Sequence, residues 1–308
     1  MHILVTGANG FVGSNLIPAL LDERWAVTVL VRDKSKINTR QWASQIQIIE
    51  TALPTTAADK NVCHGAQVVI HLAALAHTGA SKAALQLTNL DSALILAQQA
   101  RSAGVKKFIF ISSSKARYPA HSHYASYKAA AETQLLALND KSTFEVICLR
   151  PALIYGANMQ GNLKSLLTVL ALPLLPIFIR SSNMLGMISV RDVSKAILLA
   201  VKCEHMHGQI WELGDGQAYT FDLIVAHVRT HLGYKMPLFN LPRNVVKILV
   251  GVSTWLQPLV KTSLTIGTYK ALFEEHYSVD VRFNELTHFQ PEENFYQVLP
   301  SLLASFKS

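Results

Sequence analysis

The sequence predicts an α/β fold in which a doubly wound parallel sheet of the Rossmann type is followed by a smaller C-terminal region. Short β-branched runs alternate with longer helical patterns in the first half of the chain, a glycine-rich turn follows the first run, and the alternation weakens after Gly156. Alternation of this kind requires crossover connections, which place parallel strands at the centre and helices on both faces. We expect residues 1–158 to form the sheet domain and residues 159–308 to form the second region, partly interwoven with the first.

The individual elements are predicted from the periodicity of apolar residues and from the glycines and prolines that end or interrupt them. Gly104 stands where a long helix has to end before the next strand, a position that suits left-handed backbone geometry. After Gly156, prolines interrupt the pattern and helical stretches come without regularly spaced strands. The expected strands are 2–5, 26–31, 46–50, 67–71, 107–111 and 144–149, and the expected helices are 11–21, 81–103 and 124–138.

The composition predicts a folded chain with a sizeable core. Of 308 residues, 50% are apolar and 16% are charged, which is far from the composition of a disordered chain. The net charge of +8 comes without a run of five or more Lys and Arg, so it predicts small anionic ligands and no nucleic acid. Peripheral membrane contact stays open, although the apolar stretches 165–179 and 245–260 are interrupted and are not expected to span a bilayer.

The cysteines indicate the compartment. Cys63, Cys148 and Cys203 form no C-x-x-C pair and do not describe a disulfide framework, so we expect a reducing, cytoplasmic environment. The first residues run into a strand-like pattern without the order of a signal peptide. Residues 203–207 contain a cysteine and two histidines, but they end a helical pattern before Gly208, and no metal site is predicted.

The first strand runs into Gly7-Ala-Asn-Gly10-Phe11-Val12-Gly13 and then into a helix. Gly7 permits a tight turn, Gly10 lets the backbone approach a pyrophosphate, and Gly13 lets the helix pack closely against the strand. The helix N-terminus adds free N–H groups and a positive dipole end. This strand-turn-helix context predicts a dinucleotide site.

The end of the second strand indicates which dinucleotide binds. Val31 stands where an NAD site has a carboxylate for the adenosine ribose, and Arg32 follows at once. A guanidinium there can stack on adenine and pair with a 2′-phosphate, so NADP is favoured over NAD. The alternative is that Arg32 is a solvated charge at a strand end and that both cofactors are accepted.

Tyr124 and Lys128 form a Y-x-x-x-K pair, which on a helix places both side chains on one face. A lysine ammonium near a phenol stabilises the phenolate and lowers the tyrosine pKa toward the range of a general acid or base. The pair opens the helix after the strand 107–111, whose end carries Ser112-Ser113-Ser114, at the sheet edge where ligands bind.

With these motifs, the chain resembles the extended short-chain dehydrogenases/reductases, the NAD-dependent epimerase/dehydratase group. The resemblance extends over essentially the whole chain and is closest to UDP-sugar 4-epimerases and 4-keto reductases of bacterial polysaccharide synthesis. Further matching segments are 69–74, Arg150-Pro151 with Tyr155-Gly156, Val190-x-Asp192-Val193, Val279-Asp280, and Leu286-x-x-Phe289-x-Pro291.

The resemblance assigns roles by position. It implies that Ser113 hydrogen-bonds the reacting oxygen, that Tyr124 is the acid/base, and that Lys128 binds the nicotinamide ribose. It implies that the C-terminal region binds substrate, with Asn162 on the substrate phosphates. The remaining implied cofactor contacts are Phe11 and Val12 at the pyrophosphate, Leu72, Ala73 and Ala74 along the cofactor, and Ala152 and Leu153 at the nicotinamide.

The sequence departs from the nucleotide-sugar members at three places. The stretch from Ser113 to Tyr124 is shorter, Ala52 replaces an aspartate near the adenine, and Leu185 stands where many members carry an arginine for the UDP diphosphate. Either Arg180 or Lys164 replaces that arginine, or the substrate is not a nucleotide sugar. Met184, Leu185 and Met187 would suit a hydroxysteroid-like or other lipophilic alcohol.

Three functions therefore stay open. The first is hydride transfer on a nucleotide-activated sugar, by 4-keto reduction or by epimerisation through a transient ketone. The second is dehydrogenation of an apolar, hydroxysteroid-like secondary alcohol. The third is a non-catalytic dinucleotide-binding assembly subunit, against which the intact Ser113, Tyr124 and Lys128 argue. A homodimer is compatible with each of the three.

Overall fold

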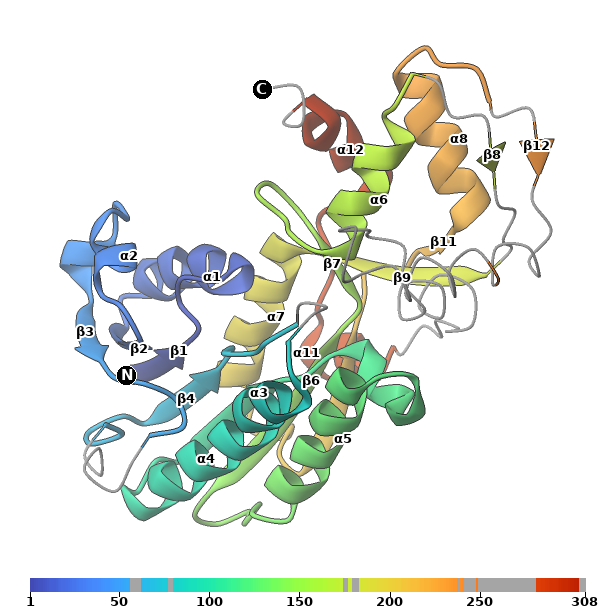
Figure 1. The fold of residues 1–308 in the computed structure, drawn as a ribbon. Helices are drawn as coiled ribbons and strands as arrows, with labels where there is room; N and C mark the ends of the chain where they lie inside the picture. Colours follow the sequence, from blue (N-terminus) through green and yellow to red (C-terminus); the bar gives the residue numbers. More distant parts are fainter. Residues whose placement is uncertain are drawn as a thin grey trace. The chain divides into compact units, whose positions relative to one another are not determined.

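The computed structural model describes residues 1–55, 62–76, 80–173, 177–178, 183–236, 239–240, 248 and 281–304 (Figure 1). The chain divides into two compact units, and it crosses between them repeatedly. Residues Val190–Leu213, which lie beyond the single boundary expected at residue 158, group with the first unit. The first unit is Met1–Ala152, Val190–Leu213 and Asp280–Gln290, and the second is Leu153–Ser189, Gly214–Val279 and Pro291–Ser308.

The first unit is built on a seven-stranded parallel sheet with strand order β10-β6-β5-β4-β1-β2-β3. This order confirms the doubly wound Rossmann-type sheet, because the chain winds outward in one direction from β1 and in the other from β4. The seventh strand, β10, comes from the region after residue 158 and pairs with β6. The strands are β1 His2–Thr6, β2 Ala26–Val31, β3 Gln47–Glu50, β4 Val68–His71, β5 Lys107–Ile111, β6 Glu145–Pro151 and β10 Gln209–Leu213.

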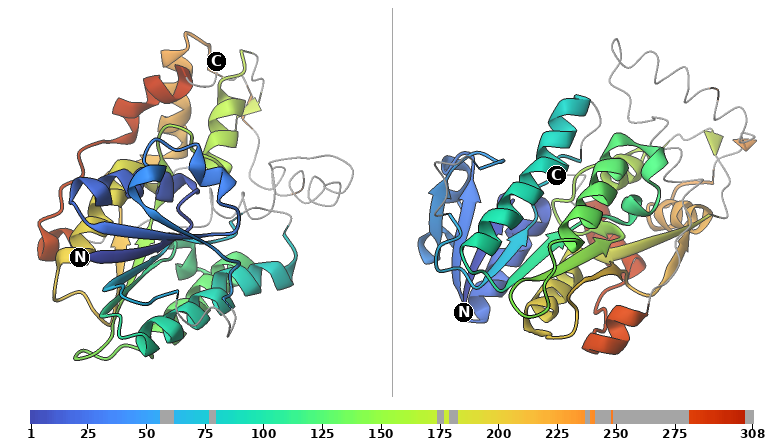
Figure 2. Two further views of the ribbon diagram at one scale, coloured as in Figure 1. Left: turned by 90° about the vertical axis from the view of Figure 1, so that its left-hand side faces the viewer. Right: turned by 90° about the horizontal axis from the view of Figure 1, so that it is seen from below.

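Helices cover both faces of this sheet. Figure 1 shows α1 and α7 on one face and α4 and α5 on the other, and Figure 2 (left) shows the strands between these two layers. The expected long helix 81–103 is interrupted by a π-helical turn at Leu87–Asp91. The helices of this unit are α1 Phe11–Asp22, α2 Ser35–Asn38, α3 Lys82–Gln86, α4 Ser92–Ser102, α5 His123–Leu136, α7 Val190–Lys202 and α11 Arg282–Thr287, with short 3-10 turns η1 Ala43–Gln45, η4 Ser114–Arg117 and η5 Pro119–His121.

The core explains why the strands read as continuous apolar runs. Leu4, Val69, Phe108 and Phe110 belong to one buried cluster with the apolar residues of α4 and α5. The alternate strand residues, such as Ile109, are also fully buried. A parallel sheet covered on both faces needs apolar side chains at successive positions.

A buried lysine fastens α7 to the sheet. Lys107, the first residue of β5, donates from Nζ to the carbonyl oxygens of Ala200 (3.2 Å), Val201 (3.0 Å) and Cys203 (2.7 Å). It also lies 3.6 Å from a carboxylate oxygen of Glu145. The ammonium therefore satisfies carbonyls at the C-terminus of α7 that have no partner within the helix.

The second unit contains a three-stranded sheet in the order β11-β9-β7 and a two-stranded sheet of β12 and β8. Its buried centre includes Tyr155, Tyr219 and Phe295, whose rings meet edge to face. Asp215 lies beside them and accepts a hydrogen bond from the Tyr219 hydroxyl at 2.5 Å. The elements are β7 Leu153–Tyr155, β8 Ile177–Phe178, β9 Met184–Ser189, β11 Ala218–Thr220, β12 Phe239–Asn240, α6 Asn162–Leu170, α8 Phe221–His231 and α12 Phe295–Ala304.

The described part of the chain bears on two features, membrane-spanning helices and metal sites. None of its helices combines the length and the apolar character needed to cross a membrane. Within the same residues, no group of three or more His, Cys, Asp and Glu side chains is arranged to hold a metal ion. The apolar stretch 245–260 and Val279-Asp280 lie almost entirely outside the described residues.

Candidate active site

The glycine turn after β1 is closed by its own backbone. Gly7 has a φ of +73°, and the Gly10 N–H donates to the Gly7 carbonyl at 3.0 Å. Gly10 precedes α1 as its N-cap, and no side chain caps that helix. The first N–H groups of α1, which begins at Phe11 and Val12, therefore stay available to an anionic ligand.

This turn touches the segment after β4. A Cβ atom at Gly7 would lie 2.7 Å from the Ala73 nitrogen and 2.9 Å from the Leu72 carbonyl carbon. Thr6 at the end of β1 holds the contact, because its hydroxyl accepts from the Ala73 N–H at 3.2 Å and its carbonyl accepts from the Leu72 N–H at 3.2 Å. The turn and residues 72–74 thus meet where the strand order reverses, between β1 and β4.

Gly13 was expected to let the helix pack closely against the strand, and the close approach lies at the turn that directly follows β1. A Cβ atom at Gly13 would lie 2.3 Å from the Gly7 oxygen and 2.6 Å from the Ala8 Cα. Gly13 is therefore required for packing the start of α1 against the turn itself. Gly10 is less restricted, since its added Cβ would meet only the Gly7 oxygen, at 3.2 Å.

Arg32 follows the end of β2 and is exposed. Its two basic neighbours have carboxylate partners, since Lys34 lies 4.0 Å from Glu50 and Lys36 lies 3.9 Å from Asp33. No ion pair to Arg32 occurs within the described residues. Val31 is buried, and its side chain offers no group for a ribose hydroxyl.

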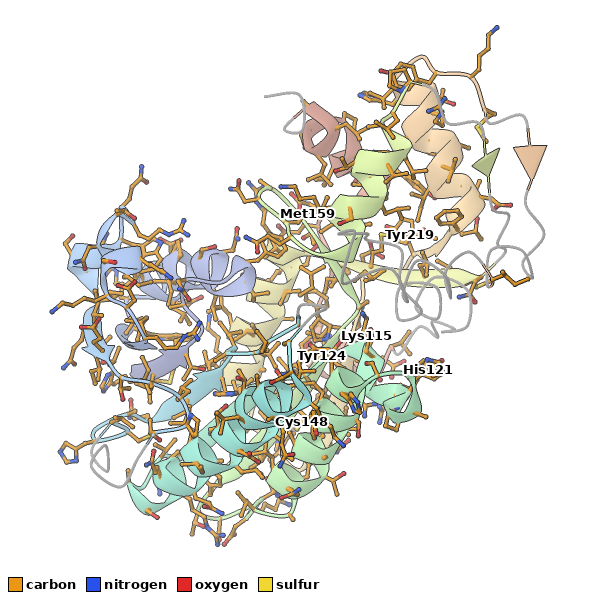
Figure 3. All side chains as sticks on the ribbon, in the orientation of Figure 1. Lys115, His121, Tyr124, Cys148, Met159 and Tyr219 are labelled. Carbon is orange, nitrogen blue, oxygen red and sulfur yellow. The ribbon has the colours of Figure 1, made fainter. Side chains whose placement is uncertain are left out.

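Ser113, Tyr124 and Lys128 all lie in the first unit, near the carboxyl end of β5. Ser113 precedes η4 and accepts from the Lys115 N–H at 3.3 Å. Ser122 starts α5 by accepting from the Ala125 N–H at 3.1 Å, and this cap places Tyr124 in the first turn of the helix (Figure 3).

The Tyr124 hydroxyl and the Ser113 side chain are hydrogen-bonded to each other. Burial raises the pKa of Tyr124 to about 12, and the bond to Ser113 opposes this shift. The expected lowering of that pKa by Lys128 does not occur, because burial of the phenol outweighs the interactions that favour the phenolate. Tyr124 is thus a neutral phenol at physiological pH.

Lys128 is fully buried one turn further along α5. Its ammonium donates to the Ile111 carbonyl at 2.8 Å and lies 4.3 Å from the centroid of the Phe110 ring. Burial lowers the pKa of Lys128 to about 7, and the charge of Glu132 works in the opposite direction. Lys128 is therefore anchored to the carboxyl end of β5.

The family is decided by sequence comparison. A model of the NAD-dependent epimerase/dehydratase family matches residues 3–214. The chain belongs to this family. It is consequently an NAD-dependent enzyme of the extended short-chain dehydrogenase/reductase type, and the reading as a non-catalytic assembly subunit is set aside.

Members and neighbours of the family vary in what they act on. A ceramide reductase of Caulobacter vibrioides (strain NA1000 / CB15N) is 31% identical over 272 residues, which cover 87% of this chain and 82% of that protein. A UDP-glucose 4-epimerase of Vibrio cholerae is 30% identical over 237 residues, 70% of each chain. Among solved structures, MoeE5 in complex with UDP-glucuronic acid and NAD superposes with a TM-score of 0.76 at 18% identity, covering 100% of this chain and 99% of that one.

The residues of the first unit suit the dinucleotide that this family binds. The Gly7 position has no room for a Cβ atom, the N-terminus of α1 has no side-chain cap, and Lys128 reaches the same edge of the sheet. Gly7, Gly10, Phe11, Val12, Gly13 and residues 72–74 would hold the pyrophosphate and the adjoining cofactor, and Lys128 would hold the nicotinamide ribose. Ala152 ends the first unit directly after β6.

Leu153, expected at the nicotinamide, and Asn162, expected on the substrate phosphates, belong to the second unit. Leu153 opens β7, and Asn162 is the first residue of α6, after Gly161 with a φ of +85°. Leu185 and Met187 are buried in β9, whereas Met184 is exposed. Arg180 lies outside the described residues.

The sequence motifs did not identify a buried ion pair close to the candidate site. Glu132 and Arg150 are ion-paired, and both are largely buried. Glu132 follows Lys128 by four residues, so helical periodicity could have placed the two on one face. Nothing in the sequence signals that Arg150 approaches Glu132, because that contact depends on how α5 packs on β6.

Proposed function

We propose that this enzyme transfers hydride between a nicotinamide cofactor and a hydroxyl-bearing or keto carbon of a nucleotide-activated sugar. The observation that carries the proposal is the hydrogen-bonded pair of Ser113 and Tyr124, one helical turn from the buried Lys128. This arrangement supplies a proton donor and a second hydroxyl at one point, and it can bind one reacting oxygen.

The protonation state of Tyr124 suits the reducing direction. Because its pKa lies near 12, the phenol holds its proton at physiological pH and can donate it to a substrate oxygen that gains electrons. A bound nicotinamide would supply the hydride to the carbonyl carbon. Ser113 donates a hydrogen bond to the same oxygen. Oxidation runs in reverse, so that the substrate hydroxyl returns its proton to a Tyr124 phenolate.

Lys128 serves both directions of the reaction by holding the cofactor. Its charge does not lower the pKa of Tyr124, which burial raises, so the phenolate that oxidation requires is the minor form at physiological pH. Lys128 is fixed by the Ile111 carbonyl and would bind the nicotinamide ribose with its other N–H groups. An epimerase needs both directions in one turnover, and a reductase needs only the first.

NADP is the cofactor that the adenosine end favours. Arg32 is exposed at the end of β2 without a carboxylate partner in the described residues, while Lys34 and Lys36 are paired. A 2′-phosphate would give the guanidinium a bidentate partner. The family as a whole is described as NAD-dependent, so the NADP preference is specific to this proposal.

A nucleotide-activated sugar is supported by two features. The Vibrio cholerae relative is a UDP-glucose 4-epimerase that aligns with 70% of the chain. Asn162 opens α6 within Gly161-Asn162-Leu163, and Lys164 follows in the first turn. Helix N–H groups, an amide and an ammonium together suit a diphosphate.

A lipophilic ketone is a second candidate. Leu185 is buried at the position where an arginine would bind a diphosphate, so this chain lacks that clamp. The Caulobacter vibrioides relative, a ceramide reductase, aligns with more of the chain than the epimerase does. The hydroxyl chemistry of Ser113 and Tyr124 would serve such a substrate equally well.

Thermal stabilisation separates the two candidates. Purified protein saturated with NADPH is heated with UDP, UDP-glucose, UDP-N-acetylglucosamine or a long-chain ketone. A ligand at 100 times its Kd stabilises the folded state by about 2.7 kcal/mol, so a specific ligand should raise the Tm. We expect UDP and UDP-sugars to do so. If only the ketone raises the Tm and is reduced, the nucleotide-sugar proposal is wrong.

A further inference from the structure

A run of alternating charges leads away from Lys128 through the interior of the first unit. Arg150 on β6 holds Glu132 with two parallel hydrogen bonds, Nε to Oε1 at 2.7 Å and Nη2 to Oε2 at 2.6 Å. Such fork-to-fork pairs fix both partners in direction as well as in distance. The Glu132 carboxylate therefore has one orientation, on the helix that carries Tyr124 and Lys128.

The run continues to the loop that carries Ser113. Arg150 also donates from Nη1 to Glu212 Oε1 on β10 at 3.1 Å. The same Glu212 oxygen lies 3.1 Å from Nη2 of Arg117, the last residue of η4. Since η4 begins directly after Ser113, the charges connect the loop of Ser113 with the helix of Tyr124 and Lys128.

The energetics of burial explain why Glu132 is needed here. An ionised group in a protein interior costs several kcal/mol unless it is paired. Without Glu132, Arg150 would keep only its contact with Glu212, and Lys128 would lose the negative charge on its own helix. With Glu132, Arg150 has a bidentate partner and Lys128 has a negative charge one helical turn away.

We propose that Glu132, held by Arg150, is a positioning residue that keeps Lys128 charged and fixed in place for the nicotinamide ribose. This inference rests on the proposed function in one respect, namely that Lys128 binds the cofactor. Glu132 does not touch substrate or cofactor in this proposal and acts only through Lys128. Glu212 and Arg117 extend the same support to the Ser113 loop.

The charged and neutral groups around Lys128 determine whether Glu132 raises or lowers the pKa of Lys128. His71 next to it is neutral, because burial and the Lys128 charge lower its pKa to about 3. Burial raises the pKa of the Cys148 thiol, which is therefore neutral as well. Among the described residues around Lys128, Glu132 is thus the charged group that raises the pKa of Lys128 against burial. The polar and charged groups of the surrounding elements are Tyr124 and Glu132 on α5, the Ile111 carbonyl on β5, His71 on β4, and Cys148 and Arg150 on β6.

The test measures the titration of Lys128 directly in the full-length protein. Lysine is labelled with ¹³C at Cε, and the Lys128 signal is identified by its loss in Lys128→Met. Replacing Glu132 by Gln keeps the size of the side chain and removes its charge. We expect the pKa of Lys128 to fall by about one to three units in Glu132→Gln.

Glu145→Gln is the matched control, because Glu145 is also an ion-paired glutamate of the first unit. Its partner is Lys107 at the opposite end of the strands. We expect it to leave the Lys128 titration unchanged. Equal pKa values of Lys128 in wild type, Glu132→Gln and Glu145→Gln would overturn the role of Glu132.

NADPH binding provides the functional readout. If only the charged form of Lys128 binds, a pKa one unit lower weakens NADPH binding by about fivefold at neutral pH, because the competent fraction falls from about a half to about a tenth. The loss should diminish at lower pH. A loss of affinity that is equal at all pH values indicates distortion of the fold and contradicts the proposal.

Two further outcomes have separate meanings. Failure of the wild type to bind either NADPH or NADH overturns the proposed function, while the titration of Lys128 still decides the role of Glu132. Should Glu132→Gln not fold, the double variant Glu132→Gln/Arg150→Gln also removes the guanidinium that has lost its bidentate partner. The same fall in the Lys128 pKa is expected there, and its absence overturns the proposal.

Discussion

Single residues of the site have protonation states that are set by burial. The phenol of Tyr124, with a pKa near 12, and the imidazole of His71, with a pKa near 3, are both neutral at physiological pH. Lys128, with a pKa near 7, is the group poised to change charge there. Cofactor binding that depends on this ammonium should therefore weaken as the pH rises through the Lys128 pKa.

Arg32 gives the sharpest prediction for the cofactor. Arg32→Ala should weaken NADP binding by about tenfold or more, as a charge-assisted hydrogen bond contributes about 1.5–3 kcal/mol. NAD binding should be unchanged. Lys34→Ala is the control, because Lys34 already has Glu50 as a partner. Titration calorimetry with each cofactor checks this, and an equal loss of NADP and NAD would make Arg32 a mere surface charge.

The residues of the site were predictable as far as local spacing determines them. Gly7, Ser113, Tyr124 and Lys128 lie at the expected places because a turn, a strand end and one helical face fix them within a few residues. The pKa direction of Tyr124 was not predictable, because it depends on burial. The partner of Glu132 was not predictable either, since Arg150 comes from a different element.

At the scale of elements, the two glycines of the turn should separate folding from binding. Gly13→Ala places a Cβ atom 2.3 Å from the Gly7 oxygen, so it should destabilise the fold by about 1–3 kcal/mol. Gly10→Ala meets only one atom at 3.2 Å and should fold nearly normally while binding NADPH more weakly. Urea unfolding and NADPH titration of both variants test this. Equal losses of stability would contradict it.

The lysine at the start of β5 should matter more for stability than its neighbour. Lys107→Met leaves three carbonyls of the α7 terminus and the Glu145 carboxylate without their partner, so we expect a loss of about 2–4 kcal/mol. Lys106→Met is the control, since Lys106 is exposed and should change stability by less than about 0.5 kcal/mol. Equal urea midpoints for the two variants would show that Lys107 does not cap α7.

Elements of the sheet were predicted well and those of the second unit were not. The strands β1, β2, β4, β5 and β6 are largely buried and contain apolar runs of three residues or more, with helices between them. In the second unit, β7 and β11 have only three residues each, which is too short for a periodic pattern. The π-helical turn at Leu87–Asp91 carries no sequence signal that helix periodicity could detect.

For the whole molecule, the parallel sheet could be predicted from the sequence, but the distant segment that completes it could be found only in the structure. Strand β10 comes from the sequence after residue 158 and completes the sheet beside β6. A crossover connection permits this pairing, but the local sequence pattern does not predict it. The same strand supplies Glu212, which pairs with Arg150 and Arg117. The edge strand of the sheet thereby contributes a carboxylate to the group of charges that connects the Ser113 loop with α5.

The central claim is that Tyr124 exchanges the proton while the nicotinamide exchanges the hydride. The most direct test is the turnover of Tyr124→Phe on any accepted substrate, with Tyr127→Phe as control, because Tyr127 lies on the same helix and its hydroxyl contacts Gln86 at 3.4 Å. Tyr124→Phe should bind NADPH and fold nearly normally but lose about two to four orders of magnitude in turnover, while Tyr127→Phe keeps its rate. Near-normal turnover of Tyr124→Phe would contradict the mechanism.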